Sequence, residues 1–263
     1  MIEIKPCGSF LNIDENGYII KQANKSLIQE EWQPIVGETV DFYKNNIKDL
    51  VSVYVRGSVA KGLAVKNISD LDSFFISDKP TEINEAAEDK FNHYIKNKYP
   101  YNFGVEIFGG TKEDVLKRRE NGKPTMLHEL IKTQSTCVFG EDQSNSLSPV
   151  KLQEMSGPLK SLTKTIQAAK EELVGNTDKD DIKDLCTWIM KKIVRSGFEM
   201  YQEKEQKWTR DLYLCYNVFK KYQPKNTELM KKILFLSLNP TDQPEIIINN
   251  LDLTIKNIKF EGA

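Results

Sequence analysis

The sequence predicts an α/β half followed by a half built from helices, and three observations carry this prediction. In the first half, short apolar runs of strand length alternate with helical patterns. From about residue 148 to 258, the spacing of apolar residues is helical almost throughout. Between the halves, the stretch 142–158 is rich in Ser, Gly and Pro, which are typical of a linker.

We therefore expect one domain over residues 1–147 and a helical domain over residues 148–263. The first domain should have a short mixed sheet of α/β (α+β) type, and the second should be an all-α bundle. At the N-terminus, Asp14-Glu15-Asn16-Gly17 lies between two apolar runs, which favours a small hairpin over residues 1–22.

The elements of both halves follow from periodicity and from Pro and Gly punctuation. A helical pattern over 25–48 contains Pro34, so a break or a new helix start is expected there. The predicted strands are 51–55, 70–76 and 102–110, and 136–142 is expected to be a short extended segment and turn. The predicted helices of the first half continue with 81–97, 111–120 and 124–134. The predicted helices of the second half are 150–173, 179–204, 209–222, 226–238 and 245–258.

Composition argues against several classes of function. Lys and Arg number 37 and Asp and Glu 38, so no global basic field attracts nucleic acid or a membrane surface. The N-terminus lacks a charged-then-apolar signal pattern, and no apolar run approaches the roughly 18 residues of a membrane span. The 4 cysteines are isolated and there are 2 histidines, so no zinc site suggests itself and a reducing compartment is expected. We expect a soluble, cytoplasmic protein with no membrane partner.

The most informative stretch runs from Val51 to Ser77 and reads VSVYVRGSVAKGLAVKNISDLDSFFIS. An apolar strand breaks at Gly57-Ser58, a polar turn follows, and the stretch continues into Asp70-Leu71-Asp72. Strand alternation points both carboxylates the same way. The Gly-Ser turn offers backbone N–H groups and a hydroxyl to phosphates, and Gly57 lets the chain approach them closely.

A third carboxylate follows on the next predicted strand, where Glu106 is the polar residue in an apolar run. Nucleotidyl transfer from a triphosphate requires neutralisation of charge at the α-phosphate, commonly by one or two Mg²⁺ ions held by carboxylates. Asp70 and Asp72 are the expected metal-binding pair. Glu106 is expected to complete the metal site or to take the proton of the attacking hydroxyl.

The spacing Gly57-Ser58, eleven residues, then Asp70-Leu71-Asp72 resembles the signature of the polymerase-β-like nucleotidyltransferase superfamily. Ser69 also fits, since many bacterial members have Ser before the first Asp. The chain departs from the pattern at two positions, because Arg56 and Ser73 stand where apolar residues are usual. The resemblance implies that Gly57, Ser58 and Ser69 bind the nucleotide and that Asp70, Asp72 and Glu106 are catalytic and bind metal.

Over its whole length the chain resembles the small bacterial aminoglycoside adenylyltransferases of the streptomycin/spectinomycin type. The resemblance implies ATP as donor, Mg²⁺ as cofactor, a site between a nucleotidyltransferase domain and a helical domain, and Glu106 as the base. It implies further that Asp142 lines the nucleotide site. In Thr209-Arg210-Asp211, Arg210 stands where a lysine reaches the triphosphate. A helical basic cluster at Lys191, Lys192 and Arg195 is an alternative source of that positive charge.

The predicted function is transfer of a nucleoside monophosphate, AMP from ATP, to a hydroxyl of a small-molecule acceptor such as an aminoglycoside, with release of pyrophosphate. A cationic acceptor of this kind predicts an acidic cleft. One alternative is an enzyme that modifies tRNA or a protein, as a toxin or regulator, which predicts a basic groove. An alternative of another class is a catalytically inactive binding module, although such modules usually lose one of the three carboxylates that this chain keeps.

Overall fold

The computed structural model describes residues 4–67 and 69–260, and its chain divides into two compact units. The sheet unit is Asp14–Met155, and the helical unit combines Met1–Ile13 with Ser156–Ala263. This division places the change of unit a few residues beyond the expected boundary at 147/148. It also assigns the first residues of the chain to the helical unit, whereas the sequence suggested the sheet domain.

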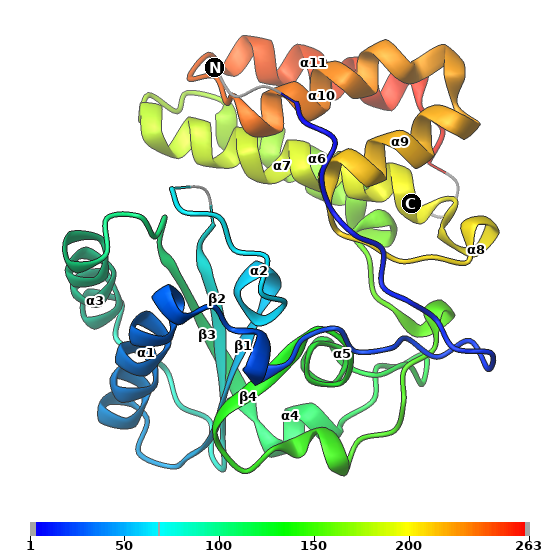
Figure 1. Ribbon diagram of the computed structural model, residues 1–263. Coiled ribbons are helices and arrows are strands. Elements are labelled where there is room, and N and C mark those ends of the chain that lie inside the picture. The colour runs from blue at the N-terminus through cyan, green and yellow to red at the C-terminus, as the bar shows by residue number, and fades with distance from the viewer. Residues whose placement is uncertain (1–3, 68, 261–263) are drawn as a thin grey trace. The chain divides into compact units, whose positions relative to one another are not determined.

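The sheet unit is built on one four-stranded mixed sheet with the order β3-β2-β1-β4 (Figure 1). Its strands are β1 (Leu50–Arg56), β2 (Leu71–Ser77), β3 (Val105–Thr111) and β4 (Ser135–Gly140). β1 pairs antiparallel with β2 and β4, and β2 pairs parallel with β3. The predicted short mixed sheet is confirmed.

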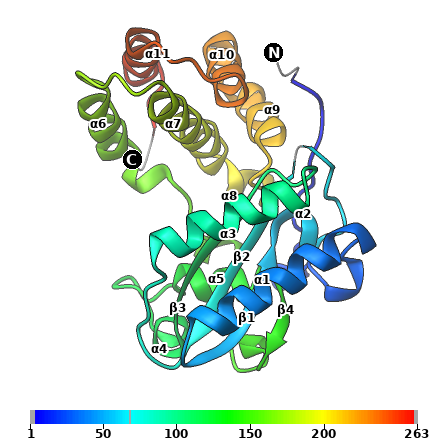
Figure 2. The same cartoon turned by 90° about the vertical axis from the view of Figure 1, so that its left-hand side faces the viewer.

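Helices cover both faces of this sheet (Figure 2). One face carries α1 (Gln33–Asn46) and α3 (Glu85–Lys98), and the other carries α4 (Lys112–Leu116) and α5 (Met126–Thr133). The one-turn helix α2 (Gly57–Ala60) follows β1 directly. Alternation along the strands assigns Val53, Val55 and Phe75 to the core under α1 and α3, and Tyr54 and Phe74 to the core under α4 and α5.

Pro34 lies in the first turn of α1, as expected of a residue that lacks a backbone N–H. The stretch before it forms two single 3-10 turns, Lys25–Leu27 and Glu30–Trp32. The helix predicted over 111–120 ends already at Leu116. The helix predicted over 150–173 begins only at Leu162, because Gly157-Pro158 interrupts the pattern and 3-10 turns precede it.

The helical unit is a bundle of helices around one apolar core (Figure 1). Its helices are α6 (Leu162–Leu173), α7 (Lys179–Glu199), α8 (Gln202–Glu205), α9 (Leu212–Tyr222), α10 (Thr227–Leu238) and α11 (Pro244–Asn257). The long helix α7 contributes many of the core side chains, among them Ile189, Met190 and Ile193. Over residues 4–67 and 69–260, no helix is both long and apolar enough to cross a membrane.

The N-terminal segment differs from the hairpin expected over residues 1–22, of which residues 1–3 lie outside the described part. Its turn is present, since the N–H of Asp14 donates to the carbonyl of Tyr18 at 2.9 Å. The flanking residues pair elsewhere: Leu11 bridges Trp208 in the helical unit, and Tyr18 bridges Lys151 in the sheet unit. Leu11 and Tyr18 thus pair with partners distant in sequence, while the turn between them keeps its local hydrogen bond.

Candidate active site

Three charged side chains form a row across the sheet at the C-terminal end of β1. Tyr54, Phe74 and Phe108 stack across β1, β2 and β3, with ring centroids 5.1 and 5.3 Å apart. Side chains two residues apart on a strand share a face. Arg56 therefore lies on the same face as Tyr54, Asp72 on the same face as Phe74, and Glu106 on the same face as Phe108. Asp72 and Glu106 are direct partners in the parallel register, so their side chains leave the sheet side by side.

The guanidinium of Arg56 joins the two carboxylates. Its Nη2 lies 2.9 Å from Oδ1 of Asp72, and the same nitrogen donates to Oε2 of Glu106. The side chain of Arg56 is only 17% exposed, against 21% for Asp72 and 47% for Glu106. The carbon Cζ of Arg56 also lies 5.8 Å from the centre of the Phe108 ring. The row is therefore a compact charged group whose arginine lies against the ring of Phe108.

Gly57 follows Arg56 and brings the backbone against the same carboxylate. Its φ of +71° lies in the left-handed region that glycine adopts without steric cost. A Cβ at this position would overlap Oδ2 of Asp72. Glycine at position 57 thus has two physical reasons: the backbone adopts a positive φ there, and the Asp72 carboxylate occupies the space that a side chain would need.

The other residues of the motif flank this row. Asp70 lies one residue before β2 and is exposed, and Ser58 is half-buried in α2. Ser69 closes the turn before β2, because its Oγ accepts the N–H of Val65 at 2.9 Å and its N–H donates to the carbonyl of Val65 at 2.8 Å. These contacts give Ser69 a turn-closing role, and phosphate binding by Ser58 and Ser69 stays a prediction.

Ser73 supports the row from behind the sheet. Its hydroxyl donates to the backbone carbonyl of Glu106 at 2.9 Å, so the hydroxyl of Tyr43, also 2.9 Å away, donates to it. Ser73 and Tyr43 are fully buried, and burial raises the pKa of the Tyr43 phenol, which keeps it a neutral donor. A polar residue at this position therefore has a structural reason: it ties α1 to the strand that carries Glu106.

The donor set suits a hard cation such as Mg²⁺, because it consists of carboxylate oxygens. Within the part of the chain that the structure describes, no three His, Cys, Asp or Glu groups converge as a metal site. The positive charge that Asp72 and Glu106 meet in the fold is that of Arg56. The metal-binding role of Asp70, Asp72 and Glu106 stays a prediction.

Asp142, another predicted nucleotide ligand, lies away from this row. It follows β4 beyond Gly140, which pairs with Ser52, whereas Arg56 pairs with Ser135 at the other end of β4. Its carboxylate accepts from the Tyr54 hydroxyl at 3.2 Å and caps a 3-10 turn through the N–H of Ser144 at 2.9 Å. Burial raises the pKa of Asp142, but the hydrogen bonds from Ser144 and Tyr54 and the positive charge of Lys21 together outweigh it, so the pKa is lowered.

Arg210 belongs to the helical unit, and its role at the triphosphate stays a prediction. Its neighbours Thr209 and Asp211 hold the N-terminal segment. The Thr209 hydroxyl donates to the carbonyl of Ser9 at 2.9 Å, and the Asp211 carboxylate accepts the N–H of Ser9 at 2.7 Å. Nε of Arg195, from the predicted basic cluster, donates to the backbone carbonyl of Arg210 at 3.2 Å.

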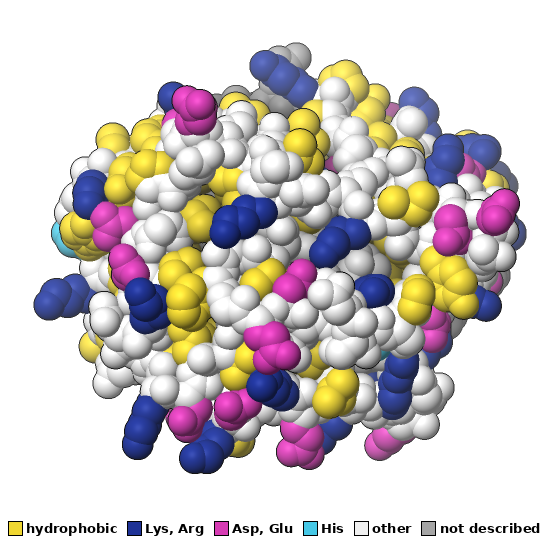
Figure 3. Space-filling view, turned by 60° about the horizontal axis from the view of Figure 1, so that its bottom comes forward, with side chains coloured by type: hydrophobic (Ala, Val, Ile, Leu, Met, Phe, Trp, Pro, Cys, Tyr) yellow, Lys and Arg dark blue, Asp and Glu magenta, His cyan; other side chains and the backbone are white. Residues whose placement is uncertain are grey.

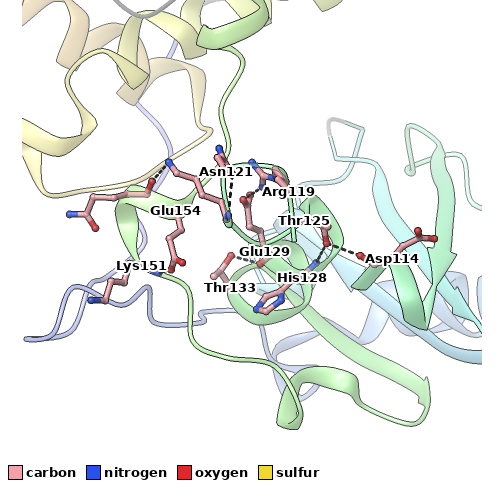
Figure 4. Close-up of polar contacts among 11 residues, drawn as sticks. Asp114, Arg119, Asn121, Thr125, His128, Glu129, Thr133, Lys151 and Glu154 are labelled. Carbon is pink, nitrogen blue, oxygen red and sulfur yellow. Dashed lines mark hydrogen bonds and ion pairs between the residues drawn. The ribbon is translucent and has the colours of Figure 1, made fainter. Parts of the chain in front are cut away.

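The helix α5, on the same side of the sheet as the charged row, is held by polar contacts (Figure 4). Thr125 caps its first turn through the N–H of His128. Glu129 is buried and pairs with Arg119 from the loop before the helix. Nε2 of the buried His128 lies 2.9 Å from the carbonyl of Ser148. These contacts give α5 a structural role in supporting the sheet.

Arg56 departs from the motif, and its place beside Asp72 and Glu106 is not among the features that the sequence predicts. A signal was available, because Arg56 shares strand parity with Tyr54 and ends an otherwise apolar run. A long cationic side chain at the end of a buried strand predicts a nearby carboxylate. Which carboxylate it meets follows only from the pairing of β1 with β2 and of β2 with β3.

Comparisons with known proteins agree with the motif. Residues 37–119 match the family model described as a nucleotidyltransferase domain. Among solved structures, the chain is similar to the spectinomycin adenyltransferase AAD(9) from Enterococcus faecialis, solved with ATP and spectinomycin. The identity is 14% over 86% of this chain and 98% of that chain, with a TM-score of 0.47.

Two toxin–antitoxin crystal structures are also similar to part of the chain. One, solved with AMP-PNP, is 17% identical over 45% of this chain and 79% of that chain, with a TM-score of 0.30. The other, a mutant of MntA-HpeT, is 14% identical over 52% of this chain and 94% of that chain, with a TM-score of 0.30. No curated protein matches the chain significantly.

Proposed function

Residues 37–119 are a nucleotidyltransferase domain, and from this premise we propose that the chain transfers AMP from ATP to a hydroxyl of a small-molecule acceptor. The observation that carries the proposal is the row of Asp72 and Glu106 on adjacent strands, with the backbone of Gly57 against Asp72. These residues meet in the domain that the family model covers.

In the proposed reaction, the acceptor oxygen forms a bond to the α-phosphorus of ATP. The bond from that phosphorus to the oxygen bridging to the β-phosphorus breaks, and pyrophosphate leaves with the electron pair. The proton of the acceptor hydroxyl passes to the carboxylate of Glu106, which at 47% exposure is open to an incoming substrate. Gly57 and Ser58 hold the triphosphate through their backbone N–H groups at the sharp turn after β1.

Asp70 and Asp72 would hold Mg²⁺, and Glu106 would be a further oxygen ligand. When bound, Mg²⁺ supplies the neutralisation of phosphate charge that this class of transfer requires. The strand register of Asp72 and the missing side chain at Gly57 support this assignment of Asp72.

The proposal is tested with α-labelled ATP, Mg²⁺ and a panel of aminoglycosides, tRNA and protein. Wild type should transfer label to one acceptor class, and Asp72→Asn should abolish transfer while the circular dichroism spectrum and melting temperature stay close to wild type. Normal turnover by Asp72→Asn would refute the assignment of Asp72. No transfer to any acceptor, with ATP still bound, would favour the inactive binding module.

A hollow of the helical unit has the acidic lining that a cationic small molecule would prefer. It measures about 340 Å³ and is lined by Glu172, Asp181, Asp184, Leu185 and Trp188. The Trp188 side chain is 49% exposed, and Nζ of Lys192 lies 5.0 Å from its ring centre. An aromatic face among carboxylates suits a polycationic ring compound, since the ring attracts cations and the carboxylates pair with them.

A second candidate is a nucleic acid acceptor, favoured by another hollow of the same unit. It measures about 390 Å³, and its lining includes Lys207, Lys220 and Lys221. A lysine-lined hollow suits phosphate oxygens, but Glu205 also lines it and pairs with Lys221. On the face of the molecule in Figure 3, acidic and basic side chains are interspersed, so that face offers no extended basic groove. Label in tRNA would support this second candidate.

A further inference from the structure

The position of Arg56 has a consequence for how the site takes up a cation. Its guanidinium lies within ion-pair distance of two carboxylates, Asp72 and Glu106, and its side chain is largely buried. Its Nε is buried and has no hydrogen-bond partner among the described residues. The guanidinium is therefore held at its outer end by the two carboxylates and at its side by the Phe108 ring.

Without a positive charge between them, Asp72 and Glu106 would face each other as like charges on adjacent strands. Like charges directly opposite each other destabilise a strand pair. Arg56 removes this repulsion and, by reaching both groups with one nitrogen, orients them toward a common point. The same oxygens are the donors that a divalent cation would use.

We propose that Arg56 is a resident counter-cation that positions Asp72 and Glu106 and sets the affinity of the site for divalent metal. A divalent ion and the guanidinium compete for the same carboxylate oxygens, so metal uptake requires Arg56 to give up its contact with Asp72. The apparent affinity for metal is lowered by the fraction of molecules in which the guanidinium holds the carboxylates. This inference rests on the proposed role of Asp72 and Glu106 as metal ligands.

The test is direct binding of Mn²⁺ in the absence of nucleotide and acceptor, measured by electron paramagnetic resonance and calorimetry. Arg56→Gln should bind Mn²⁺ about tenfold more tightly than wild type, since charge-assisted hydrogen bonds of this kind stabilise by amounts that correspond to tenfold or more. Adding Asp72→Asn to Arg56→Gln should abolish the gain. Unchanged or weaker Mn²⁺ binding by Arg56→Gln would overturn the proposal.

Thermal unfolding provides a second readout. In chelator, Arg56→Gln should melt at a lower temperature than wild type, and Mg²⁺ should raise its melting temperature more than that of wild type. If Arg56→Gln does not fold, Arg56→Lys replaces it, because an ammonium keeps the charge but lacks the planar fork. Arg56→Lys should then bind Mn²⁺ more tightly than wild type, and equal or weaker binding would overturn the proposal.

Arg118→Gln is the matched control, because Arg118 belongs to the same unit and its guanidinium contacts the hydroxyl of Ser148 at 2.7 Å. Its Mn²⁺ affinity should equal that of wild type.

The outcomes also separate this inference from the proposed function. If Arg56→Gln binds Mn²⁺ more tightly but the wild type transfers no label, the counter-cation role of Arg56 is supported and the proposed nucleotidyl transfer is refuted. If the wild type transfers label but Arg56→Gln binds Mn²⁺ no more tightly, the proposed nucleotidyl transfer is supported and the counter-cation role of Arg56 is refuted.

Discussion

At the level of single residues, Gly57 is the position where backbone and side-chain demands coincide. It follows the last residue of β1, adopts a positive φ and leaves room for Oδ2 of Asp72. The motif thus depends on this glycine for geometry at the carboxylate, as well as for access to phosphates.

Gly57→Ala should lower the rate of nucleotidyl transfer by about 100-fold or more, because displacement of a reacting group by the order of 1 Å has effects of this size. The new Cβ would push Asp72 out of its place beside Glu106. The measurement is kcat/KM with α-labelled ATP, together with the free energy of unfolding.

Gly122→Ala separates the two effects of such a substitution. Gly122 has a similar φ of +76°, and a Cβ added there would have no described atom within 4 Å. This variant should lose about 1 kcal/mol of stability from the left-handed backbone alone and keep its transfer rate. Equal activity of the Gly57 and Gly122 variants would contradict the role of the Asp72 contact.

Ser73 shows at the same scale why one motif position is polar in this chain. The chain from Tyr43 through Ser73 to the carbonyl of Glu106 satisfies two buried hydroxyls at once. An apolar residue at 73 would leave the Tyr43 hydroxyl buried without this partner, a cost of about 1–3 kcal/mol.

At the level of elements, α5 links the sheet to the loop that follows β4. Its capping residue Thr125, its buried Glu129 and its buried His128 each contact a different segment of the sheet unit. Figure 4 shows these side chains around the helix, including the pair of Glu129 with Arg119. A titratable group in such a place makes stability depend on pH.

His128 should make the sheet unit less stable below about pH 6.5. Burial, the largest cause, lowers its pKa from 6.5 in the fold; Arg118 and Lys132 act the same way, and the Ser148 carbonyl and Glu154 oppose them. Between the folded pKa and 6.5, the unfolded chain binds a proton that the folded chain does not. Stability is therefore fully present above 6.5 and is lost as the pH falls through that window.

Chemical denaturation at pH 7.5 and 5.5 measures this loss. His128→Gln should show a smaller difference between the two pH values than wild type, because glutamine does not titrate. His93→Gln is the control, since His93 is exposed on α3, and it should keep the wild-type difference. The same pH dependence in all three proteins would argue against His128.

At the level of the whole molecule, the chain crosses between its two units twice. It begins in the helical unit, passes through the sheet unit over Asp14–Met155 and returns to the helical unit at Ser156. The first segment is held by Ser9, whose backbone bonds both Thr209 and Asp211, and by the bridge of Leu11 with Trp208.

Asp211→Ala should loosen this segment, because a hydrogen bond to a charged group stabilises by about 1.5–3 kcal/mol. Hydrogen exchange followed by mass spectrometry should show faster exchange at residues 8–13 and unchanged exchange across the sheet unit. Asp180→Ala, an exposed aspartate of α7, should leave residues 8–13 at the wild-type rate. Slow exchange at residues 8–13 in Asp211→Ala would refute this role of Asp211.

The parts of this protein that follow from short stretches of sequence were predictable. The strands 51–55 and 70–76, the start of a helix at Pro34 and the helical second half all appear where periodicity places them. Gly57-Ser58 and the aspartates at 70 and 72 could be found because the alternation of strand side chains and the turn preference of glycine act within a few residues.

The long-range features were not predictable in the same way. Arg56, Asp72 and Glu106 come from three strands, and only the register of β1 with β2 and of β2 with β3 brings them into one row. Asp142 caps a 3-10 turn, and its role at the nucleotide stays a prediction. Residues 4–13 belong to the helical unit. Local sterics determine which way each side chain points, so the sequence alone predicted which carboxylates are candidates for the site. Long-range packing determines which strands are neighbours, so the arginine between those carboxylates emerged only in the fold.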